Sequence, residues 1–426
     1  MIQLSRRWLS SYRAIIYNSG SLIGTTAVTS GLGFLYWWLA ARLFTPSEVG
    51  IGAAAISAMT LIGTISTLGL GTMLTGELAR NRANAAALTN SAMLTAGAVS
   101  MVIGIGFAVL TPFLSKELSV LTSSPAAVLM FALGASFTAI ALVLDPALIG
   151  LLRADVQFVR NALFSIVKLG ALAAIPIWLG MKSGLGIYLS WLIGNIVTLA
   201  VLALYGLHKA ERRSDLHPDW RLLRGLGRKS LEHHVLNLAI LGPSMLLPIV
   251  VTTVLSAEAN AYFYTAWMLG ALVGVGPTSL TSVLYAVGSG DTQRLTQQVR
   301  FTLGLGFAIA IVANVVLWLV GDLLLGVFGQ QYVANALWPL RILGLSVVPL
   351  IMREHFVAIR RIENRAMQAS APIAIAGVAR IASALIGTRY GGLVGLTVAL
   401  LIVECVIALT MLPLVYRTAA GTAAPA

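Results

Sequence analysis

The sequence predicts an all-α polytopic membrane protein with about 12 transmembrane helices, in two six-helix bundles related by a parallel repeat. The first observation is composition: of 426 residues, 58% are hydrophobic and only 10% are charged, whereas soluble domains carry about 25% charged residues. The second is that the apolar residues form segments of about 20, which is the length that crosses a bilayer. The third is an alternation of basic residues between successive loops. These observations predict a chain whose helices face lipid.

The first two predicted spans meet at a tight turn. The apolar segment after Arg13 is too long for a signal-peptide core and lacks a cleavage site, so we expect it to span the membrane. Thr45, Pro46 and Glu48 then fit an N-cap, a first helical position and a capping-box acid. In chain order, the predicted spans are Ile15–Leu43, Val49–Gly76, Leu88–Thr111, Val128–Leu148, Phe158–Leu179, Leu185–Leu207, Leu231–Leu255, Ala259–Val287, Phe301–Val320, Ala336–Ile359, Met367–Thr388 and Leu393–Tyr416.

Basic residues divide unequally between the two sides of the membrane that these spans imply. Of the 28 Lys and Arg residues, 20 fall in the N-terminal segment, the C-terminal tail and alternate loops, and four fall in the remaining loops. Because positive charge is retained in cytoplasmic loops, both termini are predicted to be cytoplasmic. The formal net charge of +13 is thereby explained by topology, and nucleic acid is not expected as a partner.

A polar, basic stretch at residues 208–230 divides the chain in its middle. It separates a predicted N-terminal six-helix bundle (residues 1–207) from a C-terminal six-helix bundle (231–426) and is predicted to be a cytoplasmic linker. Six spans per half give both halves the same orientation, which predicts a parallel repeat about an axis along the membrane normal. The halves echo each other weakly, since Glu48 matches Glu258 and Asn18 matches Asn237.

Two stretches carry a resemblance to a known family. "NSGSLIGTTAVTSGLGFLYWWLAARLFTPSEVG" and "STLGLGTMLTGELARNR" resemble the start of bacterial polysaccharide flippases of the O-antigen type, in the multidrug/oligosaccharidyl-lipid/polysaccharide exporter superfamily. The resemblance implies a flippase that carries a lipid-diphosphate-linked oligosaccharide across the bacterial cytoplasmic membrane by alternating access. It implies a lipid-linked anionic oligosaccharide and membrane lipid as ligands, and a polysaccharide polymerase and glycosyltransferases as partners in surface polysaccharide export.

Charged residues inside spans are the first candidates for a binding site, because each such ion needs a partner or a water-filled face. Arg380 and Glu404 lie at similar sequence distances from the turn at Gly391-Gly392, so we predict that they form a structural ion pair. Lys168 and Arg341 have no evident acid and are the leading candidates for a cationic lumen. A snorkelling or backbone-bonded Arg341 is an equal alternative.

Four further residues are weaker candidates for substrate binding, and each has a structural alternative. Arg353 could contact the diphosphate or could simply lie at a membrane interface. Arg42 could contact the diphosphate or could cap a turn. Asn18 and Asn237 could bind sugar hydroxyls, or could form hydrogen bonds between helices.

The sequence gives no sign of catalysis or of a cofactor. Cys405 is the only cysteine, which excludes an intrachain disulfide and makes a metal cluster improbable. No catalytic triad or acid-rich outer loop is present, so the chain is not expected to be an enzyme. The alternatives are an integral-membrane sugar transferase or polymerase, a cation-coupled small-molecule exporter and a peptidoglycan-precursor flippase. The last usually has fourteen helices rather than twelve.

Overall fold

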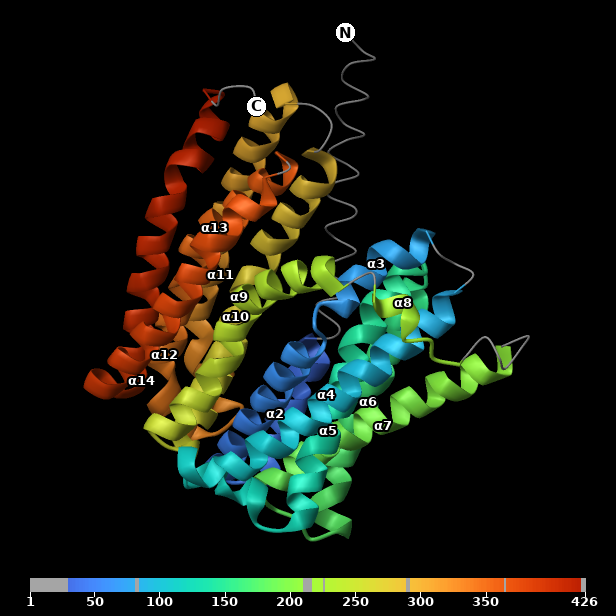
Figure 1. The fold of residues 1–426 in the computed structure, drawn as a ribbon. Helices are drawn as coiled ribbons and strands as arrows, with labels where there is room; N and C mark the ends of the chain where they lie inside the picture. Colours follow the sequence, from blue (N-terminus) through green and yellow to red (C-terminus); the bar gives the residue numbers. More distant parts are fainter. Residues whose placement is uncertain are drawn as a thin grey trace. The chain divides into compact units, whose positions relative to one another are not determined.

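The computed structural model describes residues 30–80, 84–209, 217–224, 227–288, 292–363 and 365–422, and no strand occurs among them. Residues 30–43 are helical. The helices that follow are α2 (Pro46–Ser66), α3 (Leu70–Arg80), α4 (Ala85–Leu114), η2 (Glu117–Thr122), α5 (Pro125–Gly150), α6 (Ala154–Trp178), α7 (Gly184–Lys209), α8 (Arg221–Arg224), α9 (Gly227–Val254), α10 (Ala257–Gly288), α11 (Thr292–Gly326), α12 (Gln330–Leu345), α13 (Val347–Ile362) and α14 (Ala366–Ala420) (Figure 1).

These helices confirm the predicted all-α membrane fold. Within the described ranges, ten helical segments are long and apolar enough to cross a membrane. One of the ten joins α12 and α13, and another is α14, which contains two helices joined at Gly391 and Gly392. With the helix at residues 30–43, every predicted span contains a helix.

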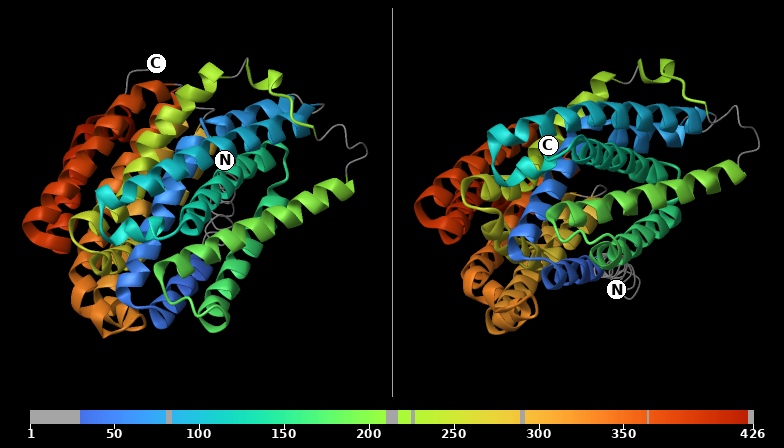
Figure 2. Two further views of the ribbon diagram at one scale, coloured as in Figure 1. Left: turned by 60° about the horizontal axis from the view of Figure 1, so that its bottom comes forward. Right: turned by 90° about the horizontal axis from the view of Figure 1, so that it is seen from below.

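Helix α2 is the centre of the first packed unit, which covers residues 32–264. Its residues Val49 to Met59 are buried without interruption, because α4, α5, α7 and α9 all pack against it. Small side chains suit this position, since Gly and Ala allow helix backbones to approach closely. α6 and α7 run side by side in the same unit (Figure 2), and they carry the candidate site described below.

The start of α2 differs in one respect from the predicted capping box. The hydroxyl of Thr45 does accept a hydrogen bond from the backbone N–H of Glu48, at 3.3 Å, and Pro46 is the first helical residue. The carboxylate of Glu48, however, accepts a hydrogen bond from the backbone N–H of Gly184, the first residue of α7. Glu48 therefore caps a different helix from its own, which satisfies a donor that α7 cannot satisfy internally.

A backbone break separates α2 from α3 in the middle of the second predicted span. Leu68 and Gly69 have positive φ angles of 49° and 75°, and a non-glycine residue in this region is uncommon. α9 packs on the break: the hydroxyl of Ser230 donates to the carbonyl of Leu68 at 2.6 Å. The amide of Asn237 donates to the hydroxyl of Thr72 at 3.0 Å. α9 thus packs with the first unit. The division of the chain into two repeated six-helix bundles at residues 208–230 stays a prediction.

The second packed unit contains the described residues from Thr265 to the C-terminus. Its last two helices form a hairpin, because Gly391 and Gly392 have non-helical backbone angles. Gly387 and Gly395 lie so close that a Cβ atom on either would meet the other's carbonyl oxygen at 2.4 Å. This tight crossing brings residues before and after the turn to equal depth, as the sequence pattern predicted for Arg380 and Glu404.

Candidate functional site

Lys168 lies in the middle of a helix that is long enough to span a membrane. It follows the first residue of α6, Ala154, by 14 positions and precedes the last, Trp178, by 10, which places it about 20 Å along the helix. Only 7% of its surface is exposed. A charge in this position is costly, at about 2.5–3.5 kcal/mol on insertion scales, so its surroundings decide how the protein tolerates it.

Three aromatic rings surround the Lys168 ammonium, and we call Tyr36, Phe164 and Trp191 the aromatic cage. The Nζ atom lies 4.1 Å from the ring centroid of Trp191, 4.8 Å from that of Phe164 and 5.0 Å from that of Tyr36. All three distances are within the roughly 6 Å over which a ring face attracts a cation. The cage therefore replaces part of the hydration that the ammonium loses on burial.

Helix 30–43, α6 and α7 each contribute to the cage, and hydrogen bonds fix its geometry. Tyr36 is fully buried, and its hydroxyl donates to the carbonyl of Ile187 at 3.1 Å and lies 2.7 Å from the hydroxyl of Ser190. The Phe164 and Trp191 rings meet edge to face at 5.4 Å. A Cβ atom on Gly194 would lie only 2.9 Å from the Phe164 ring, so a glycine lets α7 approach α6 here.

The Lys168 ammonium has no carboxylate partner among the residues that the structure describes. Asp145, the nearest acid in the sequence, instead pairs with Arg160, whose Nη2 lies 3.0 Å from its Oδ2. Arg160 lies two residues inside the predicted span that begins at Phe158, and it is buried within α6. Because Asp145 is already paired with Arg160, it is not a counter-ion for Lys168.

Arg341 has aromatic surroundings of a different kind. Its guanidinium carbon lies 5.0 Å from the Trp318 ring centroid and 5.6 Å from that of Trp338, and Nη2 donates to the carbonyl of Trp318 at 3.2 Å. The side chain is half-buried. It lies eleven residues after the first residue of α12. The backbone-bonded alternative for Arg341 is thus the arrangement observed.

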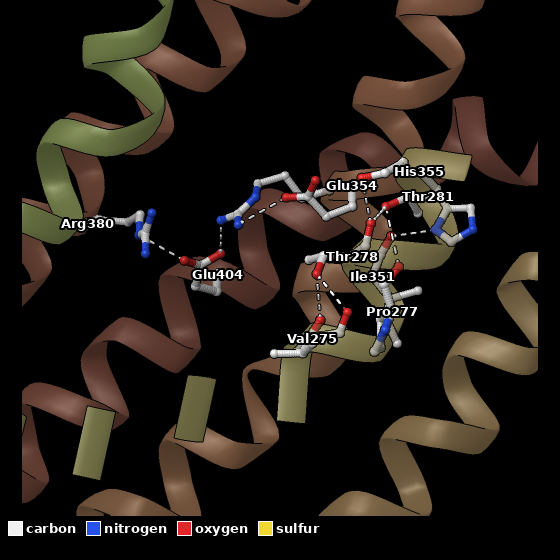
Figure 3. A network of polar contacts seen from close by, with 12 residues as sticks. Val275, Pro277, Thr278, Thr281, Ile351, Glu354, His355, Arg380 and Glu404 are labelled. Atoms are coloured by element: carbon white, nitrogen blue, oxygen red, sulfur yellow. Dashed lines mark hydrogen bonds and ion pairs between the residues drawn. The ribbon is translucent and has the colours of Figure 1, made fainter. Parts of the chain in front are cut away.

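Four other charged residues of the second unit, two arginines and two glutamates, form a connected network. Nε of Arg380 lies 2.8 Å from Oε1 of Glu404, close enough for an ion pair although not aligned as a hydrogen bond. Arg353 contacts the other oxygen of Glu404 at 3.3 Å and Glu354 at 3.4 Å. Figure 3 shows Glu404 facing Arg380, with Glu354 and His355 nearby. Arg353 is therefore engaged by two carboxylates, unlike Lys168.

The other predicted ligands have surroundings of other kinds. Arg42 is exposed in the last turn of helix 30–43. Asn237 donates to Thr72, which is the interhelical role given as the alternative for it. Asn18 lies outside the described residues. Within the first unit, Lys168 and Asn237 thus have different partners, and a common substrate site for the six predicted ligands stays a prediction.

The sequence analysis missed Tyr36, Phe164, Trp191 and Arg160. The signal for Phe164 was present, because it precedes Lys168 by four residues and so shares its helix face. Tyr36 and Trp191 lie on other helices, and only the packing brings them to Lys168. No group of three or more His, Cys, Asp or Glu side chains able to hold a metal ion occurs in the described part of the chain.

The fold defines a class of protein, a multi-pass helical membrane protein. The chain belongs to the polysaccharide biosynthesis protein family, whose sequence profile matches residues 15–285. Curated proteins yield no match to the chain.

Solved structures of transporters share the fold. An inward-facing multidrug resistance MATE family transporter of the MOP superfamily is 16% identical, with a TM-score of 0.71 over 92% of this chain and 95% of that chain. An outward-facing MATE transporter is 17% identical, with a TM-score of 0.67 over 97% and 96%. A MOP transporter from Pyrococcus furiosus, described as having a binding pocket of reverse polarity that suggests a different function, is 16% identical, with a TM-score of 0.63 over 97% and 96%.

Proposed function

We propose that the protein flips a lipid-diphosphate-linked oligosaccharide across the cytoplasmic membrane by alternating access, for surface polysaccharide export. The observation that carries the proposal is Lys168, a buried cation in mid-helix that aromatic rings hold and no described carboxylate neutralises. A diphosphate head cannot cross hydrocarbon unaided, because desolvating an ion costs on the order of tens of kcal/mol. A fixed cation reduces that cost, while the lipid tail stays in the bilayer.

The membrane potential favours the proposed direction. With both termini in the cytoplasm, as the distribution of basic residues predicts, the head group moves from a negative to a positive side. Two negative charges crossing 100 mV gain about 4.6 kcal/mol, at about 2.3 kcal/mol per charge. Outward transport then needs no obligatory coupled ion. Reporter fusions at Lys116 and Arg221 should report opposite sides of the membrane, and the same side for both would refute this orientation.

A cation-coupled drug exporter is the competing function, because the similar solved structures are MATE transporters. Such a function needs an acid in the membrane that is free to bind a cation. In the first unit, two acids lie within predicted spans. Asp145 pairs with Arg160 at 3.0 Å, and Glu232 is the second residue of its predicted span and so lies at the span's end. Lys168, by contrast, lies in mid-helix and has no carboxylate partner among the described residues, and this positive charge favours an anionic ligand over a cationic one.

A flipping assay with purified protein tests the proposal. The protein is reconstituted in liposomes with a fluorescent lipid-diphosphate-linked sugar, and a membrane-impermeant quencher measures how much reaches the other leaflet. We expect flipping by the wild type and by Lys168→Arg, and progressive loss in Lys168→Ala and Lys168→Glu. Lys116→Gln is the matched control, since it removes a lysine from a short loop. Wild-type flipping by Lys168→Glu would remove Lys168 from the path.

A further inference from the structure

Two polar groups of the aromatic cage, the Lys168 ammonium and the Trp191 indole N–H, can donate hydrogen bonds but cannot accept them. An ammonium has three donors and no acceptor, and an indole has one donor and no acceptor. The indole Nε1 of Trp191 is buried and makes no well-aligned hydrogen bond, and the Tyr36 hydroxyl is the nearby group that can accept from it. The two groups are adjacent, since Nζ lies 4.1 Å from the Trp191 ring centroid.

The oxygen atoms near the cage are already engaged. The Tyr36 hydroxyl is shared between the carbonyl of Ile187 and the hydroxyl of Ser190. The Ser190 hydroxyl in turn donates to the carbonyl of Ile187 at 2.7 Å. A ligand oxygen in the cage would accept from the ammonium and the indole N–H, and a charged oxygen is a stronger acceptor here than a neutral hydroxyl because the hydrogen bond is charge-assisted.

We propose that Trp191 is a substrate-binding residue that donates with Lys168 to one oxyanion, a phosphate or a carboxylate, and that the charge of the ammonium makes this site prefer an anion to a neutral sugar group. This inference rests on the proposed function and deepens it. The ammonium supplies the charge, and the indole N–H supplies a second, directional donor. No described carboxylate pairs with Lys168, so an oxyanion has none to displace. The contacts described for the ammonium are cation–π contacts, and an ionic partner interacts with it more strongly.

Substituting Trp191 with phenylalanine tests this role, because Phe keeps a ring face beside the ammonium but removes the N–H. The matched control is Trp38→Phe, since Trp38 also has a buried, unpartnered indole N–H but does not contact the Lys168 ammonium. Thermal unfolding of each variant in detergent verifies that the protein is folded. Lys168→Gln serves as the reference for loss of the charge.

Direct binding is measured with farnesyl diphosphate, inorganic pyrophosphate, glucuronate and glucose. We expect Trp191→Phe to bind the anions about tenfold more weakly than the wild type, Trp38→Phe to match the wild type, and glucose to bind none of them. Tight binding of farnesyl diphosphate identifies the lipid diphosphate as the oxyanion, and tight binding of glucuronate alone identifies an acidic sugar.

The outcomes separate this inference from the proposed function. Equal anion affinity for Trp191→Phe and the wild type, with weak binding by Lys168→Gln, would overturn the role of Trp191 and leave Lys168 in place. Glucose binding as tight as that of the anions would overturn the selectivity for oxyanions. Equal anion binding by Lys168→Gln and the wild type would refute both proposals.

Discussion

The two packed units hold their buried cations by opposite means. In the first unit, aromatic rings surround Lys168 and no described carboxylate reaches it. In the second unit, Arg353 and Arg380 share the carboxylate of Glu404, and Arg353 also contacts Glu354. The first arrangement leaves a net positive charge, whereas the second is neutral as a group.

This difference separates a binding role from a structural one. A buried pair contributes little net stability, but breaking it leaves an uncompensated charge, which is strongly destabilising. Aromatic ring faces stabilise Lys168, so its removal leaves no described carboxylate unpaired. Loss of Lys168 should therefore affect ligand binding, and loss of a network member should affect folding.

Replacing Lys168 with methionine should give the largest effect and the clearest contrast. The substitution keeps an unbranched side chain in the cage and removes the charge. We expect flipping to fall about 100-fold, which corresponds to a lost buried charge interaction of about 3 kcal/mol. The free energy of unfolding should stay equal or increase, because a charge in mid-membrane is removed. Flipping in liposomes and thermal unfolding in detergent measure the two quantities.

Lys168→Arg is the control for this variant, because it restores the charge within the same cage. It should recover much of the flipping rate. If Lys168→Met instead unfolds readily while its folded fraction transports at the normal rate, the contrast between the two units is wrong.

Replacing Glu404 with glutamine should destabilise the protein more than any other single change in the network. The variant leaves Arg353 and Arg380 close together without their shared carboxylate. We expect the free energy of unfolding to fall by about 3–5 kcal/mol, with flipping per folded molecule little changed. Unfolding of the purified variant and flipping normalised to folded protein provide the test. A stable Glu404→Gln that no longer transports would place Glu404 in the transport path.

Replacing Arg380 with alanine should have a smaller effect of the same kind. Glu404 keeps Arg353 at 3.3 Å, so its charge remains partly compensated. A loss of about 2 kcal/mol is expected, below the range for a pair broken completely. The amount of folded protein should decrease more than transport per molecule. Normal abundance with abolished flipping would contradict a purely structural role.

The fold was predictable because a bilayer imposes length and apolarity on each span. The sequence also predicted the hairpin ion pair, since Arg380 and Glu404 are placed by spacing from one turn. It did not identify the pair of Arg160 with Asp145, however, because the pattern shows where apolar residues stop but not which side chains of neighbouring helices meet. The cage was not predictable, because Tyr36 and Trp191 reach Lys168 only through packing of three helices.

The smallest expected effect concerns Asn237, which the sequence offered both as a sugar ligand and as an interhelical hydrogen bond. Its amide donates to the Thr72 hydroxyl at 3.0 Å, beside the backbone break at Leu68. A single hydrogen bond contributes about 0.5–1.5 kcal/mol, so Asn237→Ala should lower the free energy of unfolding by about 1 kcal/mol and leave substrate affinity unchanged. Thr72→Val, which removes the same bond from the other side, should have a similar effect.

The double variant Asn237→Ala/Thr72→Val decides between the two roles. The effects of two substitutions on the free energy of unfolding are not additive when the residues are in contact. If the amide and the hydroxyl form a hydrogen bond only with each other, the double variant should lose less free energy of unfolding than the sum of the two single variants. Unfolding of the four proteins in one detergent gives this coupling energy. If Asn237→Ala weakens binding of a lipid-linked sugar while Thr72→Val does not, and the stability effects add, then Asn237 belongs to the substrate site. The substrate site of the first unit would then include a second residue in addition to Lys168, namely Asn237 on α9, which would bind sugar hydroxyls.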